Sequence, residues 1–469
     1  MTRFGPPRRN LPGTRVKAPA AALLALALTV ALLNSGCSSL AADTPIGTGD
    51  LGLIEDTMRE VEKSYVVPVK PDQLVKGALK GMLSKLDPHS DYMTEQEYRE
   101  LMSTTSGQFG GVGIEISVEE GVPQVISAID GTPASAAGIE PGDRIVKADG
   151  QPIIGLDIGE VVRRLRGKPG IAVVLTIARA NRPAFDLSIT RAIIRVDSVK
   201  SALKPGGVGY VRISTFDENT PAQLRTALAA LRRGAGGRLA GLALDLRNDA
   251  GGLLDAAVEV TSDFLDSGTV VTTRGREPNE NRVYDAPPNG DLVRGTPVVV
   301  LINGASASAS EIVAGALQDH RRATILGTHS FGKGSVQSII PIDGHGALRL
   351  TTALYYTPSG RSIQGHGIVP DRVVAVPKDQ QVANAVITYE SDLFGSLKAT
   401  GALAPKGTPA NSAPAAPAAT SAPAATSAPG RSVARDMDHP INPKVIGTAQ
   451  DAQLSAALQL LSTHRAAAR

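Results

Sequence analysis

The stretch LALDLRNDAGGLL, residues 242–254, joins a short apolar run to a glycine turn and then to the start of a helical pattern. The apolar residues 242–246 are typical of a buried strand, and the polar and glycine residues 248–252 end it. The next residues, 253–265, have the apolar spacing of a helix. A strand that turns tightly into a helix is the unit of an α/β layer with parallel strands, so we expect functional groups at such turns.

The same unit recurs downstream. Residues 298–302 predict a second buried strand, residues 309–318 a helix, and residues 323–326 a third strand. The α/β pattern therefore extends from about residue 198 to about residue 386.

Two other kinds of pattern precede this layer. Helical spacing of apolar residues predicts two amphipathic helices, one over residues 54–65 and one that starts at Pro71 and extends to Leu86. Between residues 107 and 191 glycine turns separate three strand-like runs, at residues 113–117, 125–129 and 171–178. This second segment predicts a small β-rich module.

The composition limits the class of protein. The chain has 469 residues, of which 42% are hydrophobic and 20% charged, so it has room for about three ordinary globular domains. Its formal net charge is +3 and aromatic residues make up 3%, which excludes a nucleic-acid-coating surface with stacking platforms. Residues 399–431 are dominated by Ala, Pro, Ser and Thr and predict a flexible linker. Leu454, Leu458 and Leu461 then predict a short helix that docks on the core.

The first 41 residues have the pattern of a secretory signal sequence. Basic residues precede an apolar run at 20–33 that is too short for a comfortable membrane span. The single cysteine, Cys37, follows small residues as in a bacterial lipoprotein cleavage box, although Asn34 stands where leucine is usual. Lipidation of Cys37, cleavage after Ala41 and an uncleaved anchor stay open as alternatives. Each of them places the rest of the chain outside the cytoplasm.

The sequence NGASASASE, residues 303–311, places a serine where a strand passes into a helix. Ser308 and Glu311 fit a capping box, so a purely structural helix cap is one interpretation. The other uses the same geometry for chemistry. The free N–H groups and the positive end of the helix dipole beside Ser308 would stabilise a developing oxyanion.

A nucleophilic serine needs a base. None of the seven histidines lies in a triad context, no Gly-x-Ser-x-Gly elbow occurs at Ser308, and no His-Glu-x-x-His zinc motif exists. No metal or other cofactor is therefore expected. Lys333, in FGKGSVQ (331–337), is the other candidate base. Residues 327–333 also fit the start of a phosphate-binding loop, but Gly334 replaces the Ser or Thr that would hold Mg²⁺, which disfavours nucleotide binding.

A lysine base must be neutral, so its pKa must lie well below the ordinary value of about 10.4. Only a desolvated pocket could lower the pKa that far. Gln337 would lie about 13 Å from Lys333 in an extended strand, but beside it in a helical turn. A catalytic pairing of these residues therefore predicts a helical turn at 334–337.

Three ordered motifs resemble the carboxyl-terminal processing peptidases of the S41 family. They are DLRNDAGG (245–252), SASASE (306–311) and FGKGSVQ (331–337), and the resemblance covers about residues 50–395.

This resemblance implies roles for particular residues. Ser308 would be the nucleophile, Lys333 its base and Gln337 the residue that orients the lysine. The oxyanion donors would be the backbone N–H groups of Gly252 and Ala309.

Residues 107–191 resemble the PDZ domain that these enzymes carry. The glycine-rich loop would capture a peptide carboxylate on backbone N–H groups, and the peptide would add as a strand beside residues 114–116. The predicted peptide-binding residues are Gly111, Val112, Gly113 and Ile114 from the loop, with Val161, Val162 and Leu165 from a helix.

The predicted fold class is α/β, with a crotonase/ClpP-like spiral core, an inserted β-rich PDZ domain and an N-terminal helical segment. The domain order follows from the patterns above. We expect a signal or lipoprotein-like segment (1–41), an N-terminal helical segment (42–106), a PDZ domain (107–191), a peptidase core (192–398), a linker (399–433) and a C-terminal helical segment (434–469).

The predicted function is that of an envelope serine endopeptidase that cleaves loosely folded proteins near an apolar free C-terminus. A catalytically silent PDZ scaffold and acyl-CoA chemistry on the same core are the rival hypotheses. The expected partners are protein substrates with free C-termini, an activating adaptor protein, a membrane through the N-terminal anchor and further copies of the chain. Nucleic acid is not an expected partner.

Overall fold

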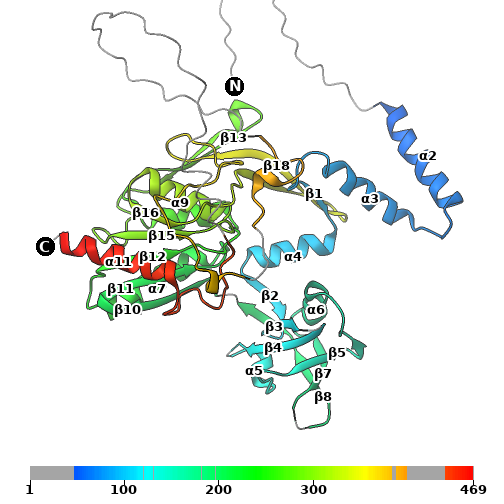
Figure 1. The fold of residues 1–469 in the computed structure, drawn as a ribbon. Helices are drawn as coiled ribbons and strands as arrows, with labels where there is room; N and C mark the ends of the chain where they lie inside the picture. The colour runs from blue at the N-terminus through cyan, green and yellow to red at the C-terminus, as the bar shows by residue number, and fades with distance from the viewer. Residues whose placement is uncertain are drawn as a thin grey trace, which may run out of the picture. The chain divides into compact units, whose positions relative to one another are not determined.

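The computed structural model describes residues 47–119, 121–129, 131–180, 182–195, 197–382, 387–398 and 439–467 (Figure 1). The predicted secretory signal with Cys37 and the predicted 399–433 linker lie outside these residues. Within them, no helix is both long and apolar enough to cross a membrane.

A six-stranded sheet forms the centre of the core. Five neighbouring strands run parallel and one edge strand is antiparallel, which confirms the predicted parallel α/β layer. The strands, in spatial order, are β10 (Val199–Lys204), β11 (Val208–Ile213), β12 (Gly241–Asp245), β15 (Val298–Ile302), β16 (Ala323–Gly327) and β19 (Arg372–Val373).

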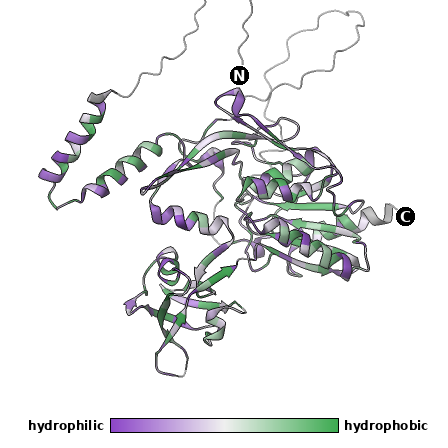
Figure 2. Ribbon diagram, turned by 180° about the vertical axis from the view of Figure 1, so that it is seen from behind, coloured by the Kyte–Doolittle hydropathy of each residue, from purple (hydrophilic) through white to green (hydrophobic). Residues whose placement is uncertain are grey.

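Both faces of this sheet are covered, which is why its strands read as continuous apolar runs. One face packs against α7 (Thr220–Gly234), α8 (Leu254–Ser262) and α9 (Ala309–Asp319), and α8 is shorter than the predicted helix. The other face packs against α11 (Ala452–Ala467), through Leu454 and Leu461. The predicted docking of the last helix is thus confirmed, and the hydrophobic strands are visible in the core in Figure 2.

A second, antiparallel sheet lies in the same unit and carries the segment after Lys333. Its main feature is the long hairpin of β17 (Ser335–Ile342) and β18 (Gly346–Tyr356). The other strands are β1 (Asp91–Met93), β13 (Gly268–Gly275) and β14 (Arg282–Ala286). Single turns of 3-10 helix occur at Pro205–Gly207, Pro278–Glu280, Lys378–Gln380 and Glu390–Asp392.

The β-rich module has its own sheet and its own hydrophobic core. The chain enters it through β2 (Gln108–Gly111) and leaves through β9 (Ala192–Arg195), and these two strands pair with each other. The sheet comprises β3 (Ile114–Glu119), β4 (Val122–Ala128), β5 (Arg144–Ala148), β6 (Gln151–Pro152), β7 (Ala172–Ala178) and β8 (Phe185–Thr190), with helices α5 (Pro133–Ala136) and α6 (Ile158–Leu165).

The two predicted N-terminal helices exist as α2 (Thr48–Ser64) and α3 (Pro71–Leu83), with proline in the first turn of α3. A third helix, α4 (Glu95–Thr105), was not predicted. Its start is nevertheless encoded locally, because Thr94 and Glu97 form a capping box in which each side chain accepts a backbone N–H of the other residue.

Candidate active site

Ser308 lies at the junction of β15 and α9, where the sequence predicted it. Its backbone φ is 55°, a left-handed value that is strained for any residue with a side chain. Two hydrogen bonds of a buried side chain hold the preceding turn: the Ser306 hydroxyl donates to the Leu246 carbonyl (2.8 Å) and accepts the N–H of Asn303 (3.0 Å). The turn therefore holds Ser308 at a helix N-terminus in a conformation it would not adopt alone.

Glu311 connects this serine to the loop that carries Lys333. Its side chain is fully buried and accepts four hydrogen bonds. Oε2 accepts the backbone N–H groups of Ser308 (2.8 Å) and Lys333 (2.9 Å), while Oε1 accepts the hydroxyl of Ser330 (2.5 Å) and the N–H of Gly332 (2.7 Å). Burial raises the pKa of Glu311 to about 7 despite these donors. The predicted capping residue thus also joins two distant loops.

Lys333 lies in the turn between β16 and β17. Burial lowers the pKa of Lys333 below its ordinary value, Arg349 lowers it further, and the anionic side chains of Glu390, Glu311 and Asp87 oppose the change. The direction is the one that a lysine base requires. The chain continues from this turn into the strand β17, so the helix that a phosphate-binding loop needs is not formed here.

The predicted helical turn at 334–337 is wrong. Residues from Ser335 onward form β17, which pairs with β18, and a bulge lies between Val336 and Gln337. Pairing with β18 satisfies the backbone groups that a helical turn would have had to satisfy locally. The Gln337 amide donates to the hydroxyls of Ser335 (3.0 Å) and Thr351 (3.2 Å). That Gln337 orients Lys333 stays a prediction.

The loop after β12 lies directly against the serine. The N–H of Ala307 donates to the carbonyl of Asp249 (2.9 Å). A Cβ on Gly251 would lie 2.9 Å from that of Ser308, so only glycine allows this approach. Among the described residues, the N–H groups of Gly252 and Ala309 donate to no other protein group. One free N–H donor on each of the two loops that meet at Ser308 fits the predicted oxyanion hole.

Tyr355 is a site residue that the sequence analysis missed. It lies near the end of β18, it is buried, and its phenol lies close to the Ser308 side chain. Burial raises the pKa of Tyr355, so the phenol stays neutral. Nothing in the local sequence marked it, because the contact depends on how β18 crosses the core.

Asp249 gives a prediction about stability. Its Oδ1 accepts the N–H of Gly251 (2.8 Å), its buried Oδ2 has no partner among the described atoms, and burial raises its pKa to about 7. Because the pKa is higher in the folded than in the unfolded chain, the free energy of unfolding should fall as pH rises from about 4 to about 7. Asp249→Asn should lack this contribution and be more stable than wild type at pH 8.

The measurement is chemical unfolding at pH 4 to 8, with the exposed Asp285→Asn as a control. Glu311 contributes a similar pH dependence to all three proteins, and so cancels in the comparison. Parallel pH profiles for wild type and Asp249→Asn would contradict the assignment of a raised pKa.

The β-rich module contains an apolar groove at the predicted place. The groove is lined by Phe109, Gly111, Val112, Gly113, Ile114, Ile116, Val162, Leu165 and Arg166. The prediction for Val161 was wrong, because this side chain is fully buried in the module's core. On α6, Val161 faces the interior of the module, whereas its neighbour Val162 lines the groove.

Arg166 was also missed. Its guanidinium lies 4.3 Å from the centre of the Phe109 ring, its buried Nε has no partner among the described atoms, and burial lowers its pKa. It directly follows the groove-lining Leu165, which is the signal that could have found it. The groove therefore has an apolar wall with a cation beside it.

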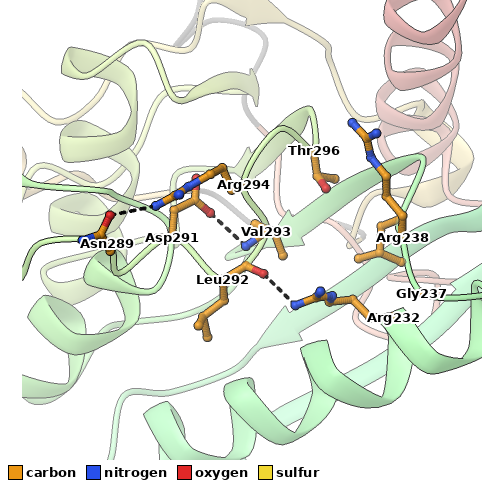
Figure 3. A pocket seen from close by; sticks show the side chains of 10 residues that line it. Arg232, Gly237, Arg238, Asn289, Asp291, Leu292, Val293, Arg294 and Thr296 are labelled. Carbon is orange, nitrogen blue, oxygen red and sulfur yellow. Dashed lines mark hydrogen bonds between the residues drawn. The ribbon is translucent and has the colours of Figure 1, made fainter.

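A polar pocket of about 620 Å³ lies elsewhere, at the surface of the peptidase core (Figure 3). Arg232, Arg238 and Arg294 line it, and the guanidinium of Arg232 donates to the carbonyl of Leu292. None of the site residues named above lines this pocket. The described residues contain no group of three or more His, Cys, Asp or Glu side chains that could hold a metal ion.

Comparisons with known proteins agree with this architecture. Residues 207–374 match the model of peptidase family S41, residues 124–179 match a PDZ domain, and residues 34–97 match the N-terminal domain of the activating protease CtpB. The carboxy-terminal-processing protease of Bartonella bacilliformis is 48% identical over 347 residues, which cover 73% of this chain and 79% of that protein. The carboxy-terminal processing protease CtpA of Bacillus subtilis is 34% identical over 381 residues, 80% of each chain.

A solved structure, the photosystem II D1 C-terminal processing protease, is 30% identical. It covers 70% of this chain and 94% of its own, with a TM-score of 0.42.

A mixed α/β core with a serine at a helix N-terminus and an appended PDZ domain defines the class as a serine peptidase. The extent of the match to the Bartonella and Bacillus proteins decides the family. The chain belongs to the S41 peptidases and is one of their carboxy-terminal processing proteases.

Proposed function

We propose that Ser308 and Lys333 are the nucleophile and the general base of a Ser-Lys endopeptidase. One observation carries the proposal. The backbone N–H groups of both residues donate to the same oxygen of the buried Glu311, at 2.8 and 2.9 Å. Two residues 25 positions apart are thereby held on one rigid acceptor, as a nucleophile and its base must be.

In the proposed reaction, neutral Lys333 accepts the Ser308 proton as Oγ attacks the scissile carbonyl. The N–H groups of Gly252 and Ala309 bind the oxyanion of the tetrahedral intermediate. Lys333 then gives its proton to the leaving amine, and an acyl-enzyme on Ser308 remains. A water attacks this ester with Lys333 again as base, which releases the acid and regenerates the serine.

The PDZ groove supports recognition of a free C-terminus. The N–H groups of Val112 and Gly113 have no acceptor among the described residues, and Arg166 adds a cation with an unpartnered Nε. A carboxylate satisfies such donors through charge-assisted bonds, and apolar side chains fit the groove wall. Proteins with apolar free C-termini are therefore the proposed substrates.

This proposal predicts a strong effect of the carboxylate on binding. A peptide with an apolar free C-terminus should bind the full chain at least about tenfold more tightly than its C-terminal amide, because charge-assisted bonds are lost in the amide. Arg166→Gln should remove much of that difference, whereas Arg163→Gln, an exposed arginine of α6, should not. Fluorescence anisotropy with labelled peptides measures both. Equal affinity for acid and amide would contradict carboxylate capture.

We further propose that the enzyme acts in the cell envelope, outside the cytoplasm, on loosely folded proteins. The N-terminal pattern with Cys37 supports this location. The same proposal includes an activating adaptor and self-association. It also includes a crotonase-like spiral arrangement of the core, which the repeated strand-to-helix connections support.

Covalent labelling tests the central proposal against its rivals. A fluorophosphonate should label the wild-type chain on Ser308, located by peptide mass spectrometry, while the same preparation degrades an unfolded protein with an apolar C-terminus. A silent scaffold would bind the peptide without being labelled and without degrading the protein. Binding of a CoA thioester without either activity would favour acyl-CoA chemistry.

A further inference from the structure

The region around Lys333 contains a buried carboxylate that the proposed mechanism does not use. The Glu390 side chain is fully buried, in the 3-10 turn Glu390–Asp392. Its Oε2 contacts His89 Nε2 at 2.8 Å, and its Oε1 accepts the Gln364 amide (2.8 Å) and the Ser396 hydroxyl (3.0 Å). These hydrogen bonds offset the cost of burying the carboxylate and fix the position of its side chain.

Hydrogen bonds connect Glu390 to the chain on both sides of Lys333, directly on one side and through Gln364 on the other. On one side, its own N–H donates to the carbonyl of Phe331 (3.1 Å), two residues before Lys333. On the other, Gln364 accepts the N–H of Gly334 (2.9 Å) and donates to Glu390. A Cβ on Gly334 would lie 2.2 Å from the backbone nitrogen of Gln364, so only glycine allows the two backbones to approach this closely.

His89 belongs to the turn 87–90, which precedes β1. Asp87 Oδ1 accepts the N–H groups of His89 (2.8 Å) and Ser90 (3.0 Å). The turn is fastened to β18, because Arg349 donates to the His89 carbonyl (3.1 Å) and the Thr351 hydroxyl donates to Asp87 (3.0 Å). His89 therefore reaches Glu390 from a rigid support.

We propose that Glu390, held by His89 and Gln364, is a positioning residue that fixes the Lys333 turn and supplies the counter-charge to its ammonium. The inference rests on Lys333 being the base. Segments on both sides of the peptidase motifs, 87–90 and 390–396, thereby become part of the proton-transfer machinery although neither touches substrate.

The charges around these groups give the direction of the effect. Lys333 faces Glu390, Glu311 and Asp87, which favour its ammonium, and Arg349, which disfavours it. Burial opposes the charge of Glu390, but the bonds from His89 and Gln364 outweigh burial and hold its pKa below the ordinary range. An ionised Glu390 therefore raises the pKa of Lys333, and its removal should lower it.

The test is the pH profile of kcat/KM for peptide cleavage by the full chain. Glu390→Gln should lower kcat about 10- to 100-fold with little change in KM, because a displaced base slows only chemistry. It should also move the acid limb to lower pH by about half a unit or more. The exposed Glu259→Gln should change neither value. A lower rate with an unmoved acid limb would overturn the electrostatic role.

His89 provides the second pair of variants, because its side chain is partly exposed and its loss is less of a threat to folding. His89→Gln keeps an N–H donor for Glu390 and should retain most of kcat, whereas His89→Ala should lose it. Equal kcat in both would overturn the positioning role.

The outcomes separate this inference from the proposed function. If wild type is active and a Lys333 variant is inactive, but the Glu390 and His89 variants behave as wild type, only the positioning role fails. If the Lys333 variant is active, the proposed function fails.

Discussion

Ser308→Ala abolishes peptide-bond cleavage while the fold is retained: this is the largest effect that we expect from any substitution in the chain. Without the hydroxyl no acyl-enzyme can form, and what remains is the oxyanion hole acting on a water. Loss of a nucleophile of this kind lowers kcat by about 10⁴- to 10⁶-fold. The measurement is time-resolved degradation of an unfolded protein with an apolar C-terminus, with thermal unfolding as a check on the fold.

The strained backbone of Ser308 offers a matched control. At a φ of 55° alanine is strained as serine is, so Ser308→Ala should unfold close to the wild-type temperature. Ser308→Gly relieves the strain and should be stabilised by about 1 kcal/mol while being equally inactive. Residual cleavage above about 1% of the wild-type rate in either variant would contradict the role of Ser308. A destabilised Ser308→Gly would show that the turn stores no strain.

The parts of this site that could be predicted are those that local sequence encodes. The strand-to-helix turn at Ser308 follows from an apolar run followed by a capping pattern, and the turn after β12 follows from the polar and glycine residues that come after a buried strand. In both cases the residues that make the turn are neighbours in the chain, so short-range rules apply.

Other parts depend on strand pairing between distant segments. The spacing of Gln337 from Lys333 alone predicts a helical turn, but Gln337 pairs with β18 beside a bulge. Tyr355 reaches Ser308 only through the register of the same hairpin. His89 and Glu390 are 301 positions apart and meet only in the folded chain. No local pattern records such contacts, since they depend on which strands are neighbours.

Lys333→Met gives the second large effect and bears most directly on the type of mechanism. Methionine approximates the length and the apolar stem of lysine but accepts no proton, so Ser308 would lose its base and the leaving amine its acid. We expect a loss of about 10²- to 10⁴-fold in kcat/KM. Fluorophosphonate labelling of Ser308 should slow as well, because that reaction also requires removal of the serine proton.

The pH dependence distinguishes a lost base from a damaged fold. In wild type the rate should rise with pH as Lys333 loses its proton, with an apparent pKa below that of a free lysine, because burial lowers it. The residual activity of Lys333→Met should lack this rise. Since the buried ammonium is disfavoured in the folded chain, the variant should also be at least as stable as wild type at pH 6, where lysine carries its charge. An acid limb that persists unchanged in Lys333→Met would assign the base to another group, and an unstable variant would mean that the lysine is held for packing and not for proton transfer.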